Sequence, residues 1–369
     1  MKYYVDLNKE EFAYMQLYKQ MKKDIVDGVL PFGSKLPSKR LLAEETGVSV
    51  ITVEHTYSIL CDEGYIEARQ RSGYYVIYRE SDFHTVSQSN IARVELHHVP
   101  FREPSHGKAK CGFPFSVLAK TMRRVLTDYS KEILVKSPNQ GCQELREAIT
   151  SYLKRTNGII VRPGQIIIGS GAEYLYSLIV QLLGKDRVFA LENPSYHKIQ
   201  QVYEANGVTC EMLALGRDGI KTGELEKTNA TVLHITPFNS FPSGVTANIS
   251  KRQEYLRWAD SRDGYIIEDN YDSELTVSKK NEDTVFSLAN NNTVIYLNTF
   301  SQTIAPSMRI GYMVLPGELA NPFFDKMGFY SCPVPAFDQY VLAEFISNGD
   351  FERHINRSRR KLRQSLKNK

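Results

Sequence analysis

Six short runs of β-branched and other apolar residues recur along the chain from about residue 112, and helical patterns separate them. Strands that alternate with helices in this way are typical of an α/β domain built around a largely parallel sheet. The predicted strands are Gln165 to Ile168, Arg187 to Leu191, Thr231 to Ile235, Tyr265 to Glu268, Thr293 to Leu297 and Gly311 to Val314. We therefore expect one α/β domain over residues 112–369.

Residues 1–78 follow a different pattern of short helices that ends in an aromatic, alternating stretch. Ser38 and Ser49 are predicted to cap a second helix through Glu45 and a third to about Glu63. A strand, a turn and a strand follow from Tyr65 to Tyr78. Side chains expected to face the core of these helices are Tyr14, Leu17, Tyr18, Met21, Ile25, Val26, Leu41, Leu42 and Ala43. Three helices closed by a hairpin make a winged helix-turn-helix, and the polar, turn-rich residues 79–111 form the predicted linker.

Composition places the protein among ordinary soluble chains, with 42% hydrophobic and 24% charged residues. The start, MKYYVDLNKE, is charged, and Ser177 and Gln181 interrupt the longest apolar run, so we expect neither a secretory signal nor a membrane span. Five scattered cysteines without a CxxC pair favour a cytoplasmic location, with no metal site.

The net charge of +4 is unevenly distributed, because residues 351–369 carry eight Lys or Arg against Glu352 alone. This segment contributes +7, which leaves −3 for the rest of the chain. We interpret it as a solvated terminal helix that frays, with a nucleic-acid contact as the alternative. Bulk charge therefore does not decide the function.

The segment from Leu30 to Val76 resembles the DNA-binding domain of the GntR family of bacterial regulators: LPFGSKLPSKRLLAEETGVSVITVEHTYSILCDEGYIEARQRSGYYV. The resemblance implies that the third helix enters the major groove of double-stranded DNA and that the hairpin touches the backbone. The DNA-binding residues it implies are Lys39, Arg40, Ser49, Thr52, His55, Arg71, Ser72 and Gly73. Val50-Ile51 stands where the family usually has a polar pair, and suits apolar contact with thymine methyl groups.

Residues 1–80 hold eleven Lys or Arg against twelve Asp or Glu, so this domain lacks a strong basic excess. A winged helix that contacts only proteins is the alternative interpretation. We expect weak DNA binding by each protomer, with a dimer on a two-part site supplying the missing affinity.

Four segments of the α/β domain suit a phosphorylated ring. Gly169-Ser170-Gly171-Ala172 can bring backbone amides and a helix start close to a phosphate. Tyr196 can stack on a flat ring, and the carboxylate and phenol of Asp269 and Tyr271 suit a pyridinium nitrogen and its phenolic oxygen. Hydroxyls and an arginine between Thr299 and Arg309 offer further phosphate ligands.

In this order and spacing, the segments resemble the large domain of fold-type-I pyridoxal-phosphate aminotransferases. Behind a GntR-like winged helix, they resemble the MocR subfamily of transcription regulators, which implies sensing of pyridoxal phosphate, often with an amino compound, and a head-to-tail homodimer. The cofactor-binding residues implied are Gly171, Ala172, Tyr196, Asp269, Tyr271, Thr299, Ser301 and Arg309.

The chain departs from that pattern at Gln302, where the family has the lysine that holds the cofactor as an imine. A carboxamide cannot form this bond, so we expect no transaminase activity and, at most, non-covalent binding of pyridoxal phosphate. From the same resemblance, we expect most of the family's small C-terminal domain to be missing from this chain. Two alternatives stay open: an aminotransferase that uses another lysine, such as Lys198, and a remnant that acts only through dimerisation.

Overall fold

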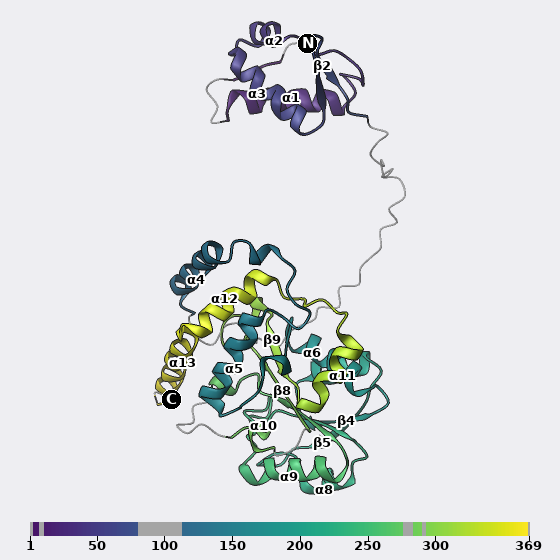
Figure 1. Cartoon of the computed structure of the whole chain (residues 1–369), viewed down its shortest axis with the longest axis vertical. Coiled ribbons are helices and arrows are strands. Elements are labelled where there is room, and N and C mark those ends of the chain that lie inside the picture. Colours follow the sequence, from purple (N-terminus) through teal and green to yellow (C-terminus); the bar gives the residue numbers. More distant parts are fainter. Residues whose placement is uncertain (1–2, 7–10, 80–112, 276–282, 290–292, 368–369) are drawn as a thin grey trace. The chain divides into compact units, whose positions relative to one another are not determined.

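The computed structural model describes residues 3–6, 11–79, 113–275, 283–289 and 293–367, which form two compact units (Figure 1). All of the predicted linker except Arg79 lies outside the described residues. The domain boundaries 1–78, 79–111 and 112–369 therefore stay predictions. Within the described residues, no helix is both long and apolar enough to cross a membrane.

The N-terminal unit is the predicted arrangement of three helices and a hairpin. Its elements are α1 (Ala13–Val26), α2 (Lys39–Thr46), α3 (Val50–Asp62), β1 (Ile66–Arg69) and β2 (Gly73–Val76). The hydroxyls of Ser38 and Ser49 accept hydrogen bonds from the amides of Leu41 and Thr52 at 3.2 and 3.1 Å, so both predicted caps are present. Gly47 ends α2 with φ +70°, a conformation that glycine adopts without strain.

Two core assignments in this unit are wrong. Val26 is 40% exposed and Leu41 is 47% exposed, whereas Leu17, Met21 and Leu42 are fully buried. Each misassigned side chain adjoins a buried position in sequence, and one helical step of about 100° is enough to carry it from the core to solvent.

The C-terminal unit is built on a seven-stranded sheet in the order β3-β9-β8-β7-β6-β4-β5. The strands are β3 (Ile166–Gly169), β4 (Val188–Asn193), β5 (Thr209–Ala214), β6 (Val232–Ile235), β7 (Tyr265–Asp269), β8 (Val294–Thr299) and β9 (Gly311–Val314). Only β9 runs against its two neighbours in this sheet, so the largely parallel sheet is confirmed. Strand β5 was not predicted from the sequence. It lies at the edge of the sheet, and most of its residues are exposed or half-buried, so it contains no run of buried apolar residues.

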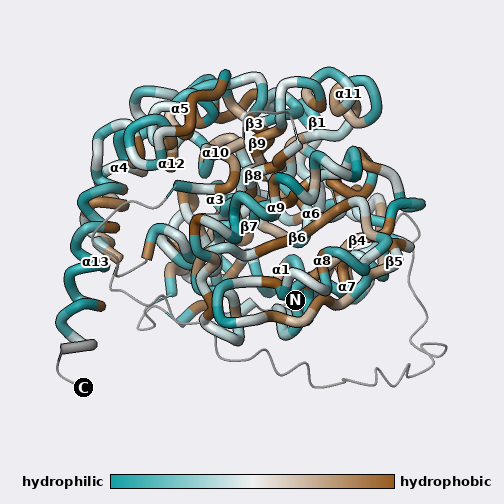
Figure 2. The backbone as a smooth tube through the Cα atoms, turned by 90° about the horizontal axis from the view of Figure 1, so that it is seen from below, coloured by the Kyte–Doolittle hydropathy of each residue, from teal (hydrophilic) through white to brown (hydrophobic). Residues whose placement is uncertain are grey.

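Helices cover both faces of this sheet, which makes three layers (Figure 1). They are α4 (Phe115–Asp128), α5 (Gln143–Asn157), α6 (Ala172–Leu183), α7 (His197–Ala205), α8 (Thr222–Lys227), α9 (Ile249–Ser261), α10 (Val285–Leu288), α11 (Gly317–Met327), α12 (Ala336–Ser347) and α13 (Asp350–Lys367). Ile167 of β3 packs in the cluster of α6, α7 and α11, while Ile166 and Ile168 pack in that of α5, α12 and α13. Figure 2 shows hydrophobic residues along the strands of this sheet.

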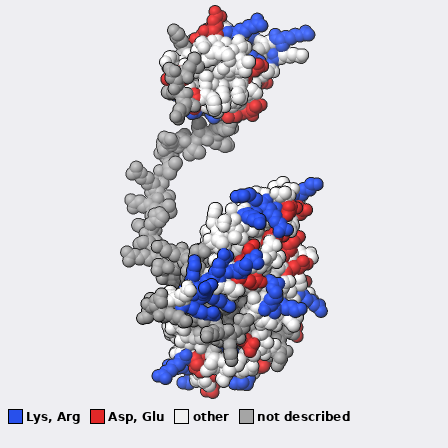
Figure 3. Space-filling view, turned by 90° about the vertical axis from the view of Figure 1, so that its left-hand side faces the viewer, with Lys and Arg blue, Asp and Glu red and all other residues white. Residues whose placement is uncertain are grey.

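Helix α13 is anchored and is not the wholly solvated helix predicted from its charge. Phe351, His354, Ile355 and Ser358 are buried at helical spacing, and Arg359 donates a hydrogen bond to the Glu274 carbonyl at 2.6 Å. The remaining Lys and Arg are largely on the solvent side, and Figure 3 shows Lys and Arg gathered on one face of this unit.

The sheet topology brings the candidate ligand-binding segments together. β3, β7 and β8 run in the same direction, so their carboxyl ends lie at one edge of the sheet. Asp269 ends β7, Thr299 ends β8 and Gly169 leads from β3 into α6. Crevices beyond the carboxyl ends of parallel strands are where ligands bind in open α/β sheets.

Candidate functional sites: a ligand pocket and a nucleic-acid interface

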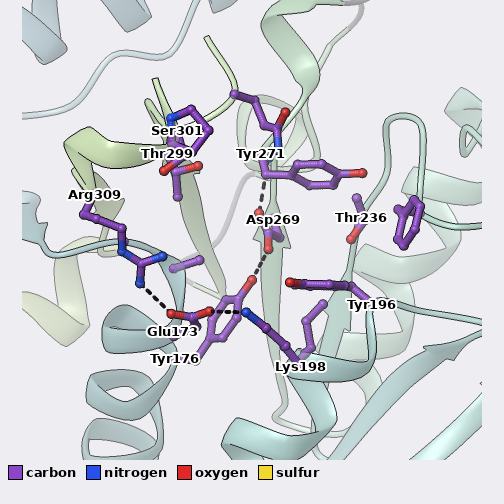
Figure 4. A pocket seen from close by; sticks show the side chains of 16 residues that line it. Glu173, Tyr176, Tyr196, Lys198, Thr236, Asp269, Tyr271, Thr299, Ser301 and Arg309 are labelled. Carbon is purple, nitrogen blue, oxygen red and sulfur yellow. Dashed lines mark hydrogen bonds and ion pairs between the residues drawn. The ribbon is translucent and has the colours of Figure 1, made fainter. Parts of the chain in front are cut away.

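A pocket of about 180 Å³ lies at this edge of the sheet (Figure 4). All eight residues predicted to bind a cofactor line it, and Gln302 lines it with them. The structure also adds residues that the sequence reasoning did not assign. These are Glu173, Tyr176, Ile199, Thr236, Phe241 and Pro306, with Lys198, which was considered only as an alternative amine.

The start of α6 forms one wall of the pocket. Gly171 has φ +99°, and a Cβ atom there would lie 3.4 Å from Nη2 of Arg309, so the arginine lies against this bare backbone. No side chain caps the helix, and its first internal bond runs from the Leu175 amide to the Gly171 carbonyl at 3.4 Å. The preceding amides of the first turn therefore have no acceptor within the helix, which suits an anion.

An ion-pair cluster joins this helix start to two cations. Glu173 Oε2 lies 2.5 Å from Nη2 of Arg309, and Glu173 Oε1 lies 3.5 Å from Nζ of Lys198. Burial alone would raise the pKa of Glu173, but the hydrogen bond from Arg309 and the charges of both cations hold this pKa below its ordinary value. The carboxylate is therefore ionised at neutral pH.

Asp269 is the buried carboxylate at the floor of the pocket, with 2% exposure. The Tyr176 hydroxyl donates to its Oδ2, and the Tyr271 amide donates to Oδ1 at 3.2 Å. Nε2 of His234 lies 3.7 Å from Oδ2, and Nδ1 of the same ring is 2.7 Å from the Tyr203 hydroxyl. These neighbours fix the orientation of the carboxylate, which suits a protonated ring nitrogen.

Several aromatic side chains line the pocket. The Tyr271 hydroxyl donates to the Asn239 carbonyl at 3.3 Å, and burial raises the pKa of Tyr271, so this phenol stays a hydrogen-bond donor at neutral pH. Tyr196 lies beside Asp269 in Figure 4, with its ring centre 6.2 Å from that of Phe241. The pocket thus has a flat surface beside a phenolic donor.

These residues fit most, but not all, of a pyridoxal phosphate molecule. The free amides of α6, Arg309 and the hydroxyls of Thr299 and Ser301 are suitable donors for a phosphate, and Asp269 suits the ring nitrogen. The usual covalent link is not matched, because Gln302 offers a carboxamide. Lys198 is the one lysine among the described residues that line the pocket, and its amine faces Glu173.

Glu192, close to the pocket, gives a prediction about pH. Burial raises the pKa of Glu192 to about 7, although bonds from the Ser240 hydroxyl and the Thr236 amide lower it in part. The folded state therefore binds more protons than the unfolded state between about pH 4.5 and 7, so stability falls as pH rises through this window. We expect Glu192→Gln to remove about 2 kcal/mol of that loss between pH 5 and 8.

Urea unfolding followed by Trp258, the single tryptophan, measures this slope in the C-terminal unit. Glu226→Gln, at an exposed position, is the control and should keep the wild-type slope. Stability curves that stay parallel for Glu192→Gln and the wild type would contradict the assignment.

The residues predicted to contact DNA are distributed over α2, α3 and the hairpin. Arg40 is exposed, and no ion pair to it is present among the described residues, whereas Lys39 pairs with Glu54 at 2.6 Å. His55 is exposed but stacks on Tyr14 of α1, with ring centres 4.2 Å apart. At the tip of the hairpin Arg71 has φ +58° and is exposed.

The amino-terminal end of α3 presents apolar side chains to solvent. Ile51 is 77% exposed and Val50 is 42% exposed, while the Ser49 and Thr52 hydroxyls bond each other at 2.8 Å. Ser49 thus serves first as a cap. Ser72 at the hairpin tip lies beside Gly73 and bonds the Tyr75 hydroxyl at 2.7 Å. The roles of these residues toward DNA stay predictions.

The cap on α3 can be tested separately from DNA binding. Ser49→Ala removes the acceptor of the Thr52 amide and should destabilise α3 by about 1 kcal/mol. Amide hydrogen exchange in α3 should then be about five times faster. Ser58→Ala, at an exposed position in the same helix, should leave exchange nearly unchanged; equal rates in both variants would contradict the capping role.

Known proteins match both units. Residues 13–76 match the family model of bacterial regulatory proteins of the gntR family, and residues 103–368 match that of aminotransferases of class I and II. The chain is 33% identical over 351 residues to the uncharacterized HTH-type transcriptional regulator YdeL of Bacillus subtilis (strain 168), covering 94% of this chain and 76% of the relative. It is 29% identical to the probable rhizopine catabolism regulatory protein MocR of Rhizobium meliloti, covering 96% and 76%. The chain is a MocR-type regulator of the GntR family.

Other MocR-type relatives and solved aminotransferases agree with this assignment. The pyridoxine biosynthesis transcriptional regulator PdxR of Corynebacterium glutamicum is 28% identical, with 94% of this chain and 75% of the relative covered. The Pyrococcus horikoshii kynurenine aminotransferase in complex with PMP has a TM-score of 0.62 at 28% identity, covering 67% of this chain and 64% of that one. This MocR-type chain thus spans just under two thirds of that enzyme. As in its MocR-type relatives, a DNA-binding domain of a transcription regulator accompanies an aminotransferase-like domain.

The sequence reasoning missed the residues that pair with the predicted ones in this MocR-type pocket. Tyr176 and His234, which hold Asp269, lie within an apolar helix and an apolar strand, where a polar residue signals a buried partner. Glu173 lies two residues after Gly171, so the sequence already places an acidic side chain at the predicted phosphate site.

Proposed function

We propose that this regulator senses a phosphorylated pyridine compound, pyridoxal 5'-phosphate or a close relative, through non-covalent contacts, and that it does not catalyse transamination. Gln302 is the observation that carries this proposal. It lines the pocket directly after Ser301, and its side chain has no hydrogen-bond partner among the described residues. A carboxamide nitrogen is neither basic nor nucleophilic, so it can neither hold an aldehyde as an imine nor move protons.

The pocket residues then act as a binding site. Arg309, the hydroxyls of Thr299 and Ser301 and the free amides of Gly171 to Glu173 would hold the phosphate. Asp269 would hold a proton on the ring nitrogen, and Tyr196 would cover the ring. Tyr271 would turn its hydroxyl hydrogen from the Asn239 carbonyl to the phenolic oxygen. Bound pyridoxal phosphate supplies an aldehyde that an amino compound can reach.

The N-terminal unit would read DNA as one half of a homodimer in the cytoplasm. Arg40 and the hairpin tip would contact phosphates, and Val50 and Ile51 would lie against thymine methyl groups. A dimer on a two-part operator compensates for the weak charge of each unit through effective concentration.

Two measurements test this function. A mobility-shift assay on the DNA upstream of the chain's own gene, with and without pyridoxal phosphate, should show binding whose midpoint changes with the ligand. Pyridoxal phosphate should bind the full-length protein in calorimetry, yet leave no adduct after borohydride treatment. Failure to retain any double-stranded probe at low salt, while the protein is folded and dimeric, would refute the DNA-binding role.

Lys198 supports a second candidate, an aminotransferase that uses this lysine. Its amine lines the pocket, with 19% of the side chain exposed. Mass spectrometry after borohydride treatment distinguishes the two functions, because a stable pyridoxyl group on Lys198 and turnover of an amino donor would both favour the enzyme. Loss of both signals in Lys198→Arg would complete that case.

A further inference from the structure

The ion-pair cluster at the start of α6 places a protein carboxylate where the phosphate of a ligand would bind. Each oxygen of Glu173 reaches a different cation: Arg309 Nη2 at 2.5 Å and Lys198 Nζ at 3.5 Å (Figure 4). Arg309 follows β8 and Lys198 lies on α7, so one carboxylate joins two sides of the pocket.

One of these cations, Arg309, belongs to the proposed phosphate site, and Lys198 pairs with the same carboxylate. Among the described residues that line the pocket, Lys198 is the one lysine and Arg309 the one arginine. Nη2 of Arg309 lies 3.4 Å from the Cβ position of Gly171, at the start of α6, which no side chain caps. A phosphate at the amides of this helix would therefore meet the guanidinium from the side that Glu173 occupies. Two anions at one pair of cations repel each other, most strongly where water is partly excluded.

The charges of the residues that line the pocket support this competition. Glu173 and Asp269 balance Arg309 and Lys198, so the charges of the lining residues cancel before any ligand enters. Arg309 is 55% exposed and needs no internal partner to offset burial, whereas Glu173 is 35% exposed. An ion pair of so exposed a guanidinium contributes little free energy, so Arg309 can exchange this carboxylate for the phosphate of a ligand.

We propose that Glu173 is an internal competitor of the ligand's phosphate group: its carboxylate pairs with Arg309 and Lys198 and must leave them when a phosphorylated ligand binds. This inference rests on the proposed function of the pocket as a site for a phosphorylated pyridine compound. Glu173 then sets specificity, because it weakens binding of phosphorylated ligands and leaves their unphosphorylated counterparts unaffected.

Isothermal titration calorimetry on the full-length protein tests this role. The probes are pyridoxal 5'-phosphate, pyridoxamine 5'-phosphate, inorganic phosphate and unphosphorylated pyridoxal. Glu173→Gln keeps the size of the side chain but removes its charge, and should tighten binding of the three phosphate-bearing probes about tenfold. Binding of pyridoxal should not change. Glu204→Gln, on the exposed side of α7, should match the wild type for every probe.

A second variant guards against a folding defect. Glu173→Asp keeps the charge but withdraws it by one methylene, and should give an affinity between those of the wild type and Glu173→Gln. Affinity that rises across this series for phosphate-bearing probes alone supports the competition.

Equal or weaker phosphate binding by Glu173→Gln, with wild-type binding intact, would overturn the competition and make Glu173 a residue that positions Arg309. Absence of binding of phosphorylated pyridines to the wild type and to both variants would overturn the proposed function together with the inference. The two failures therefore give different results.

Discussion

Gln302→Lys should convert the pocket into one that holds pyridoxal phosphate covalently. Gln302 lines the pocket next to Ser301, so an amine on the longer lysine side chain can reach the same space as the carboxamide. This amine would supply the nucleophile with which the aldehyde of pyridoxal phosphate forms an imine, with loss of one water molecule. We expect a visible absorption band and retention of the ligand through dialysis, with an apparent affinity at least about 100-fold higher, or about 2.7 kcal/mol.

Borohydride should reduce this double bond and fix the ligand on residue 302, which peptide mass spectrometry locates. Gln302→Met, of similar length but without an amine, is the matched control and should give no adduct. An adduct on Lys198 in the wild type, or no adduct in Gln302→Lys despite measurable binding, would contradict the proposed geometry of the pocket.

Arg40→Ala should reduce DNA affinity by at least about 100-fold, because a dimer loses two charge-assisted hydrogen bonds worth about 1.5 kcal/mol each. Arg40 is exposed and has no ion-pair partner among the described residues, so its charge is available to DNA. Lys39→Ala should cost less, because Lys39 must first leave Glu54, 2.6 Å away.

Salt dependence separates a phosphate contact from a structural effect. If each Arg40 binds a phosphate, the slope of log affinity against log salt should become shallower by about 2 for the dimer. Arg123→Ala, which removes an exposed charge from α4 of the other unit, should leave both the affinity and the slope unchanged. An unchanged slope for Arg40→Ala would show that Arg40 does not bind a phosphate.

Local signals predicted much of this fold. Serine caps, glycine turns and apolar periodicity indicated the helices and hairpin of the N-terminal unit, since each depends on residues close in sequence. Strand β5 lacked such a signal: Thr209 is exposed and only Leu213 of this edge strand is buried. Its place in the sheet depends on pairing with β4, a contact that its own composition does not indicate.

The residues of the pocket also differ in whether the sequence alone indicated them. Gly171, Asp269 and Arg309 were found because each belongs to a short segment with its own chemical character. The bond from Tyr176 to Asp269 spans 93 positions, and that from Arg309 to Glu173 spans 136. Such partnerships form only when the sheet brings distant segments together, so no local pattern predicts them.

The origin of the pocket walls has a consequence for the lifetime of the protein in the cell. A bound ligand would contact residues as far apart in sequence as Gly171 and Arg309. Only the folded chain brings these residues together, so the ligand would bind the folded state alone. At a free concentration 100 times its dissociation constant, it would add about 2.7 kcal/mol to the free energy of unfolding. Scarcity of the ligand would then leave the regulator more open to proteolysis, so that nutrient supply would set its abundance as well as its activity.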